Sequence, residues 1–232
     1  MSDVILEVCN LSKTFAEGDR QRSVFSNLNA SISKGEFVVL LGRSGSGKST
    51  LLNLISGIDL PSGGEVRIGG RNLTGMTEQQ RTLFRRDHIG FVFQFYNLIP
   101  TLNVMENLLL PLELKKSLDA DSQRRALDIL QQVGLEDRSA SYPDRLSGGE
   151  QQRVAICRAL IHNPLVLLAD EPTGNLDAES GREVLALLDQ LIRKGRMTAL
   201  MVTHSAEVAR LADRVITIKD GGLVETAAST EA

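Results

Sequence analysis

The chain has 232 residues, 42% of them hydrophobic and 24% charged, a composition typical of one folded globular domain. Its formal net charge of −3 lacks the basic excess that nucleic-acid binding requires, and two cysteines with three histidines argue against a disulfide scaffold or a structural zinc site. Apolar runs fall far short of the roughly 20 residues of a membrane span, and no basic residue precedes Lys13 as a signal peptide would require. We therefore expect a cytoplasmic protein that binds no nucleic acid and does not itself cross a membrane.

The first third of the chain is rich in strand patterns, and the middle is helical. Strands are predicted near residues 4–11, 24–32, 37–41 and 65–68. Thr77-x-x-Gln80 is a capping-box pattern that would begin a short helix. Apolar spacing predicts a further helix over residues 119–133, which would end at Gly134.

Strands and helices alternate after Pro164. Buried strands are predicted at residues 165–169 and 197–202, with a helix between them that ends at Gly195, a helix after Ser205 and a closing hairpin at Asp220-Gly221. This order predicts an α/β fold: a core with a parallel sheet, an N-terminal antiparallel β layer and a helical insertion lobe. We expect one domain over residues 1–225, with its core at 1–94 and 159–225 and its helical lobe at 95–158, and a polar tail at 226–232.

The segment Gly42–Ser49 reads GRSGSGKS and matches the pattern G-x-x-x-x-G-K-[ST]. It follows the apolar strand at 37–41 and leads into an apolar-rich helix at 49–56, which is the setting of a P-loop. Its glycines let backbone N–H groups converge on phosphate oxygens, Lys48 would reach the β- and γ-phosphates, and Ser49 would offer its hydroxyl to Mg²⁺. A glycine-rich turn that merely connects strand to helix is the alternative.

Two adjacent carboxylates, Asp170 and Glu171, follow the buried strand at residues 165–169. The carboxyl end of a parallel strand faces the crevice in which α/β proteins bind ligands. One carboxylate would serve Mg²⁺ through water, and the other would orient or deprotonate the attacking water. A solvated acidic pair at the end of a strand is the alternative interpretation.

A second Ser/Gly-rich helix start, Leu146–Gln151 (LSGGEQ), precedes a helical stretch at residues 152–161 and again suits an anion. One nucleotide does not obviously need two such sites. With this segment the chain resembles the ATP-binding-cassette ATPases over nearly its whole length. In that family the signature lies between the P-loop and the Walker B strand, and it completes the ATP site of the opposite subunit.

The resemblance implies a role for each matching residue. Gln94 corresponds to the Q-loop glutamine, Asp170 and Glu171 to the Walker B aspartate and catalytic glutamate, Leu176-Asp177 to the D-loop, His204 to the switch histidine, and Phe15 to the aromatic that stacks on adenine, which is usually tyrosine. The implied catalytic residues are Glu171, His204, Gln94 and Lys48. The implied ATP-binding residues are Phe15, Gly42, Arg43, Ser44, Gly45, Ser46, Gly47, Lys48, Ser49, Thr50, Gln94, Ser147, Gly148, Gly149, Gln151 and Asp177. The implied Mg²⁺ ligands are Ser49, Gln94 and Asp170.

Three segments, at residues 90–100, 147–156 and 172–177, resemble the lipoprotein-releasing, macrolide-exporting and cell-division ATPases. This resemblance implies a homodimer around two Mg-ATP molecules that drives a separate integral membrane subunit from the inner face of the cell membrane, for export, lipoprotein release or mechanotransmission. The alternative is a regulatory cell-envelope or division module that moves a periplasmic domain without transporting cargo. Cassette ATPases of DNA repair or translation carry a long coiled-coil insertion or a second cassette, for which this chain has no room.

The segment at residues 97–111 contains more apolar residues than a free loop would carry. Core packing accounts for some of them. The resemblance implies that this stretch borders the groove that takes a short cytoplasmic helix of the membrane subunit.

Overall fold

The computed structural model describes residues 4–18, 20–219 and 221–226, so the polar tail predicted over residues 226–232 lies outside the described residues except for Thr226. The strands are β1 (Val4–Glu17), β2 (Arg20–Ser33), β3 (Phe37–Leu41), β4 (Gly63–Ile68), β5 (Arg71–Asn72), β6 (Ile89–Val92), β7 (Val166–Asp170), β8 (Thr198–Thr203), β9 (Arg214–Lys219) and β10 (Gly222–Thr226). The helices are α1 (Lys48–Ile55), α2 (Glu78–His88), α3 (Val104–Leu114), α4 (Ser122–Gln132), α5 (Gly148–Leu160), α6 (Ala178–Gly195) and α7 (Ala206–Ala209), with 3-10 turns at Glu136–Arg138 and Pro143–Arg145.

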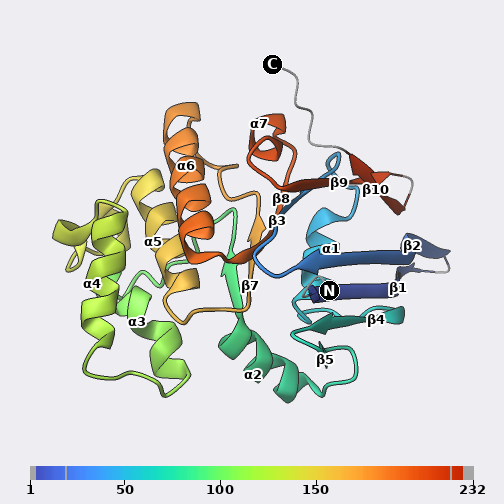
Figure 1. The fold of residues 1–232 in the computed structure, drawn as a ribbon, viewed down its shortest axis with the longest axis horizontal. Coiled ribbons are helices and arrows are strands. Elements are labelled where there is room, and N and C mark those ends of the chain that lie inside the picture. The colour runs from blue at the N-terminus through green and yellow to red at the C-terminus, as the bar shows by residue number, and fades with distance from the viewer. Residues whose placement is uncertain (1–3, 19, 220, 227–232) are drawn as a thin grey trace.

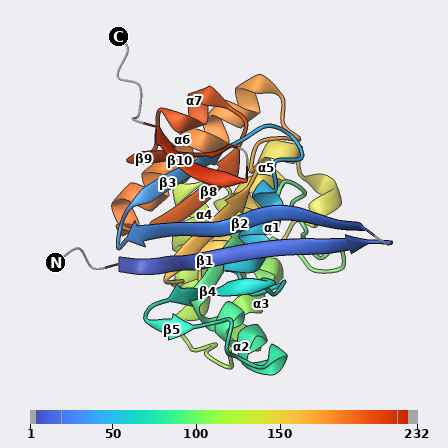
Figure 2. The same cartoon turned by 90° about the vertical axis from the view of Figure 1, so that its right-hand side faces the viewer.

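The strands form two sheets (Figure 1). The four-stranded sheet has the order β2-β1-β4-β5 and is antiparallel, with β1 and β2 crossing the front of the molecule in Figure 2. The six-stranded sheet has the order β10-β9-β3-β8-β7-β6 and is parallel except for β10, which closes an antiparallel hairpin with β9. The predicted α/β class with a parallel sheet and an antiparallel N-terminal layer is therefore confirmed.

The central strand β3 separates the two halves of the core. Val38 and Leu40 pack into a cluster with residues of α1 and the antiparallel sheet, whereas Phe37 and Val39 pack into a cluster with residues of α3, α5 and α6. Because successive side chains of a strand point to opposite faces, a strand covered on both sides must be apolar throughout, and β3 is. The P-loop thus follows a strand that is covered on both faces.

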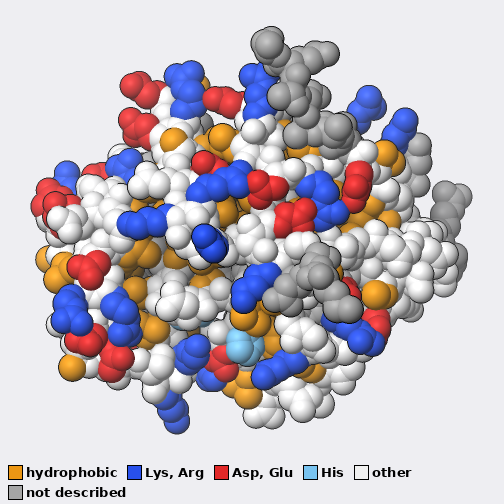
Figure 3. All heavy atoms as spheres, viewed as in Figure 1, with side chains coloured by type: hydrophobic (Ala, Val, Ile, Leu, Met, Phe, Trp, Pro, Cys, Tyr) orange, Lys and Arg blue, Asp and Glu red, His pale blue; other side chains and the backbone are white. Residues whose placement is uncertain are grey.

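Helices α3, α4, α5 and α6 lie together on the side of the molecule away from the antiparallel sheet (Figure 1). The proposed division into a core at 1–94 and 159–225 and a helical lobe at 95–158 stays a prediction. On the face drawn in Figure 3, acidic and basic side chains are interspersed, and apolar side chains are visible between them. Within the described ranges, no helix combines the length and hydropathy needed to span a bilayer.

Several boundaries differ from the sequence predictions. Strands β1 and β2 continue to a Glu17–Arg20 pair, because backbone pairing does not depend on apolar side chains. Helix α5 begins at Gly148 rather than near residue 152, since Ser147 and Glu150 form a complete capping box. Helix α3 was not predicted, although its own capping box, Asn103 with Glu106, is readable in the sequence. The capping box predicted at Thr77 is present.

Candidate nucleotide site

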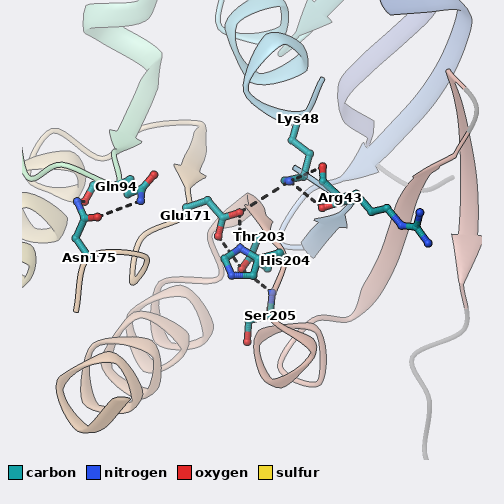
Figure 4. A network of polar contacts seen from close by, with 9 residues as sticks. Arg43, Lys48, Gln94, Glu171, Asn175, Thr203, His204 and Ser205 are labelled. Atoms are coloured by element: carbon teal, nitrogen blue, oxygen red, sulfur yellow. Dashed lines mark hydrogen bonds and ion pairs between the residues drawn. The ribbon is translucent and has the colours of Figure 1, made fainter. Parts of the chain in front are cut away.

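The P-loop begins α1 with Lys48 folded back over the loop. Its Nζ donates to the carbonyl oxygens of Gly42 at 2.8 Å and Arg43 at 3.2 Å, and the side chain is 9% exposed. Gly47 has a φ of 96°, and a Cβ there would lie 2.6 Å from Phe25 Cζ, so only glycine fits this position. The Arg43 side chain points away from Lys48 (Figure 4). The loop therefore holds its lysine amine in place through its own carbonyl groups.

Asp170, the last residue of β7, lies beside the start of α1. Its Oδ1 is buried and has no hydrogen-bond partner among the described residues. Burial raises the pKa of the Asp170 carboxyl, a hydrogen bond with Ser49 partly offsets that rise, and the neighbouring Glu171 raises it further. A buried carboxylate oxygen without a donor, next to a hydroxyl, is an arrangement that a small cation would complete.

Glu171 is held in an uncommon backbone conformation at the carboxyl end of the sheet. Its φ is 46°, and its N–H donates to the carbonyl of Val202 at 2.9 Å. Its Oε2 accepts from Thr203 Oγ1 at 3.1 Å, and its Oε1 lies 3.0 Å from His204 Nδ1 and 3.9 Å from Lys48 Nζ (Figure 4). Thr203 and His204 thus hold this carboxylate at the sheet edge with the P-loop lysine facing it, and the bond to Val202 holds its backbone.

A cavity of about 420 Å³ joins these features. It is lined by Phe15, Arg22, Val24, Ser44, Gly45, Gly47, Lys48, Ser49, Thr50, Gln94 and Glu171. A second cavity, of about 630 Å³, is lined by the predicted residues Gly42, Arg43, Ser46 and His204 together with β9 and α7. The structure therefore brings the predicted aromatic, P-loop, glutamine and glutamate residues to one hollow.

Gln94 reaches the same cavity from the segment after β6. Its Nε2 donates to Asn175 Oδ1 at 3.1 Å, and Asn175 Nδ2 donates back to the Gln94 carbonyl at 3.1 Å (Figure 4). A Cβ on Gly174 would lie 2.9 Å from Gln94 Nε2, so glycine leaves room for this pair. Because the amide nitrogen is engaged, the Gln94 side-chain oxygen is left to face a ligand. Asn175 was not among the predicted site residues.

The Ser147 segment lies elsewhere. Ser147 is exposed and caps α5: its Oγ accepts from the Glu150 N–H at 3.2 Å, and its N–H donates to Glu150 Oε2 at 2.7 Å, which holds the pKa of Glu150 below its usual value. Asp177 caps α6 in a similar way, and hydrogen bonds from Ser180 and Glu179 lower the pKa of Asp177. None of the predicted residues Ser147, Gly148, Gly149, Gln151 and Asp177 lines either cavity.

Two residues of α5 that sequence reasoning missed, the buried Gln152 and the half-buried Arg158, connect that helix to the nucleotide site. Gln152 is 0% exposed, and its Nε2 donates to the carbonyls of Pro172 at 2.7 Å and Phe93 at 3.3 Å. Arg158 donates to the carbonyls of Asn97 and Tyr96 at 2.7 and 2.9 Å, and burial lowers the pKa of its guanidinium. The available signal in the sequence was a glutamine and an arginine at positions close to the apolar residues of α5, because polar side chains at such positions need hydrogen-bond partners.

A P-loop with a pinned lysine, facing two carboxylates at the end of strand β7 in the same parallel sheet, defines a nucleoside triphosphatase of the α/β class. The model of the ABC transporter family matches residues 25–174, and the chain belongs to this family. It is accordingly an ATPase subunit that binds and hydrolyses ATP.

Relatives and solved structures agree with this assignment. The chain is 54% identical over 220 residues to an uncharacterised ABC transporter ATP-binding protein of Mycobacterium tuberculosis, covering 95% of this chain and 89% of that protein. It is 45% identical over 221 residues to the macrolide export ATP-binding/permease protein MacB of Escherichia coli, covering 95% of this chain and 34% of MacB. The dimeric structure of the cassette MJ0796 bound to ADP and Pi matches with a TM-score of 0.87 and 41% identity, covering 98% of this chain and 100% of that one. The resemblance to the macrolide-exporting group is thereby confirmed.

Proposed function

We propose that two copies of this chain close around two ATP molecules, each held between the P-loop of one copy and the Ser147 segment of the other. The supporting observation is the separation within one chain: the cavity collects Phe15, the P-loop, Gln94 and Glu171, while Ser147 stays exposed at the start of a 13-residue helix. A twofold axis would supply each cavity with the missing helix start. The similar cassette MJ0796 is described as dimeric.

In this arrangement, residues of the two copies would bind the adenine base and the phosphates of ATP. Phe15, 40% exposed at the edge of the cavity, offers its ring face to adenine. The P-loop, residues 42–50, offers backbone N–H groups to the phosphates, and Lys48 already stands over the loop. From the partner copy, the Ser147 hydroxyl, the N–H groups of Gly148 and Gly149, and the Gln151 and Asp177 side chains would close the site.

The oxygen donors around Asp170 fit Mg²⁺. Ser49 contributes a hydroxyl and Gln94 an amide oxygen, since the Gln94 amide nitrogen is engaged by Asn175. Asp170 contributes a buried carboxylate oxygen that has no hydrogen-bond partner within the described part of the chain. Mg²⁺ prefers such oxygen ligands and keeps several waters when it binds beside phosphates. When bound, it would supply positive charge to the transferring phosphoryl group.

Glu171 is placed to orient the attacking water and to accept its proton. The Thr203 hydroxyl and the His204 ring hold its two oxygens at 3.1 and 3.0 Å, so the carboxylate cannot turn freely. A fixed carboxylate lowers the barrier by positioning the water before reaction, which is most of what phosphoryl transfer requires. His204 therefore acts on the reaction through Glu171 in this proposal.

The work of this cycle would be delivered to a separate integral membrane subunit, with the ATPase bound to its cytoplasmic face. The relative MacB is named as an ATP-binding/permease protein. We propose that the permease function lies on another chain here and serves export, lipoprotein release or mechanotransmission. Exposed apolar side chains near Gln94, Phe95 at 68% and Ile99 at 36%, offer a contact surface for it.

Dimerisation tests the proposal. A Glu171→Gln variant, which cannot easily finish hydrolysis, should run as a monomer without nucleotide and as a dimer with Mg-ATP in size-exclusion chromatography with light scattering. Adding Ser147→Arg should abolish the dimer, because a large cation would occupy the helix start, while Ser117→Arg, at another exposed serine, should leave it intact. A Ser147→Arg protein that still dimerises with Mg-ATP would contradict the proposed arrangement.

A further inference from the structure

Lys13, two residues before Phe15 in β1, has a buried ammonium with three partners. Its Nζ donates to the carbonyl of Leu60 at 2.7 Å, pairs with Asp59 Oδ2 at 2.7 Å and stands over the Phe15 ring, 4.7 Å from the ring centroid. The Lys13 side chain is only 10% exposed. A lysine is rarely buried to this extent without a specific set of partners, and here the partners come from two separate parts of the chain.

The first of these parts is the segment that follows the phosphate-binding helix. Asp59 and Leu60 come shortly after α1, and the Asp59 N–H donates to the carbonyl of Asn53 within that helix at 3.1 Å. Lys13 therefore joins the strand that carries Phe15 to the helix that begins with Lys48. Ser62 bonds the backbone of Ser12 and Thr14 in the same region, so the backbone of β1 is anchored there independently and Lys13 adds the contact that reaches the Phe15 ring.

The second part is the aromatic ring itself. Phe15 lines the 420 Å³ cavity and is 40% exposed, whereas Lys13 is not among the residues that line that cavity. The ammonium thus contacts the ring from outside the nucleotide space and leaves the cavity side of the ring for a ligand. An exposed ring without such a contact exchanges rotamers freely, and each rotamer-rich group that is ordered on binding lowers affinity.

We propose that Lys13 is a positioning residue that fixes the Phe15 ring to receive the adenine base before ATP binds. This inference rests on the adenine-stacking role proposed above for Phe15. Lys13 would act on the base through the ring, so it should influence base-dependent binding and leave phosphate binding and chemistry unchanged.

The test compares ATP with inorganic tripolyphosphate, which has the phosphates without the base. Lys13→Met should weaken ATP binding about 3- to 10-fold by isothermal titration calorimetry and leave tripolyphosphate affinity and kcat within about twofold. Phe15→Ala should weaken ATP in the same selective way, and Lys13→Met added to Phe15→Ala should cause no further loss. Lys34→Met, which removes an exposed lysine from the turn before β3, is the matched control and should bind ATP normally.

The outcomes distinguish the adenine-stacking role of Phe15 from the positioning role of Lys13. If Phe15→Ala binds ATP normally, the adenine role of Phe15 in the proposed function is wrong. If Phe15→Ala weakens ATP but Lys13→Met does not, or if Lys13→Met weakens tripolyphosphate equally or adds fully to Phe15→Ala, the positioning role is overturned. A circular-dichroism melt checks folding; should Lys13→Met fail to fold, Asp59→Asn, which loosens the anchor and keeps the ammonium, should show the same selectivity with a smaller loss, and an unselective loss would overturn the proposal.

Discussion

The two helix starts that carry phosphate-binding sequence patterns differ in what surrounds them. At the P-loop, Lys48 is buried against its own loop and faces Glu171, with the carboxyl of Asp170 beside Ser49. At the start of α5, Ser147 is exposed and its polar groups are used for capping its own helix. The same local device, a glycine-rich helix N-terminus, is enclosed in one region and open in the other. In the proposed dimer, the open one would be completed by the second copy of the chain.

The two regions are nevertheless physically joined. Gln152 in α5 bonds the backbone just before Gln94 and just after Glu171, and Arg158 bonds the backbone two and three residues beyond Gln94. A displacement of the backbone around Gln94 or after Glu171 would therefore be transmitted directly to the helix that presents Ser147. Variants in each region test this contrast.

The largest effect is expected from removing the charge of Glu171 at the P-loop site. We expect Glu171→Gln to reduce the hydrolysis rate about 10² to 10⁴-fold, because a positioned base is lost, while ATP binding stays intact. Phosphate release and equilibrium ATP binding measure the two quantities, with Glu136→Gln as an exposed control that retains both. Near-normal turnover in Glu171→Gln would show that another group handles the attacking water.

A charge at the exposed apolar surface near Gln94, formed by Phe95 and Ile99, should abolish binding of the membrane partner without changing ATPase activity. We expect Ile99→Glu to leave the ATPase rate of the isolated subunit within about twofold and to abolish co-purification of the membrane partner, since an unpaired charge in an apolar interface costs several kcal/mol. Recovery from detergent-solubilised membranes is the measurement. Leu127→Glu, at an exposed apolar position on α4, is the control and should retain the partner. Normal recovery with folded Ile99→Glu would place the coupling surface elsewhere.

Truncating Gln152 should loosen the connection between the regions. Gln152→Ala removes a donor from the buried carbonyl of Pro172 and the partly buried carbonyl of Phe93, so the free energy of unfolding should fall by about 1–3 kcal/mol. Urea unfolding measures that change, and the exposed Gln131→Ala should shift it little. We also expect ATP binding to remain and Mg-ATP-dependent dimerisation to weaken in the Glu171→Gln background. An unchanged unfolding free energy would remove Gln152 from its proposed role.

The smallest effect concerns Asp170 in the nucleotide-free protein. Burial raises the pKa of Asp170, so ionising it in the folded state opposes folding above its ordinary pKa of 3.8. Asp170→Asn should therefore raise the melting temperature by a few degrees at pH 7 to 8. This gain should shrink as the pH falls, and it should vanish where the Asp170 carboxyl is protonated in both the folded and the unfolded protein. Melts across pH, with exposed Asp128→Asn as control, test the sign. A gain that persists at acid pH would contradict it.

Much of the site was readable because its determinants are local. The P-loop, the acidic pair after β7 and the capping boxes at Thr77 and Ser147 each depend on residue types within a few positions of one another. For the stretch at 97–111, the sequence showed only that it contains more apolar residues than a free loop would carry. Whether Val104 is buried and Ile99 exposed depends on how α3 packs against the neighbouring helices, which short-range spacing does not encode.

The class of fold and the phosphate loop could be predicted from the amino-acid sequence, because both follow from residue types and spacing along the chain, and its motifs carried the resemblance to the family. Which distant groups meet depended on tertiary packing. Lys13 and Leu60 are 47 residues apart, Gln152 and Phe93 are 59 apart, and Gln94 and Asn175 are 81 apart. Single polar residues at such separations have no periodic pattern, and their partners are backbone carbonyls or loop side chains that only the packed sheet and helices bring within hydrogen-bonding distance.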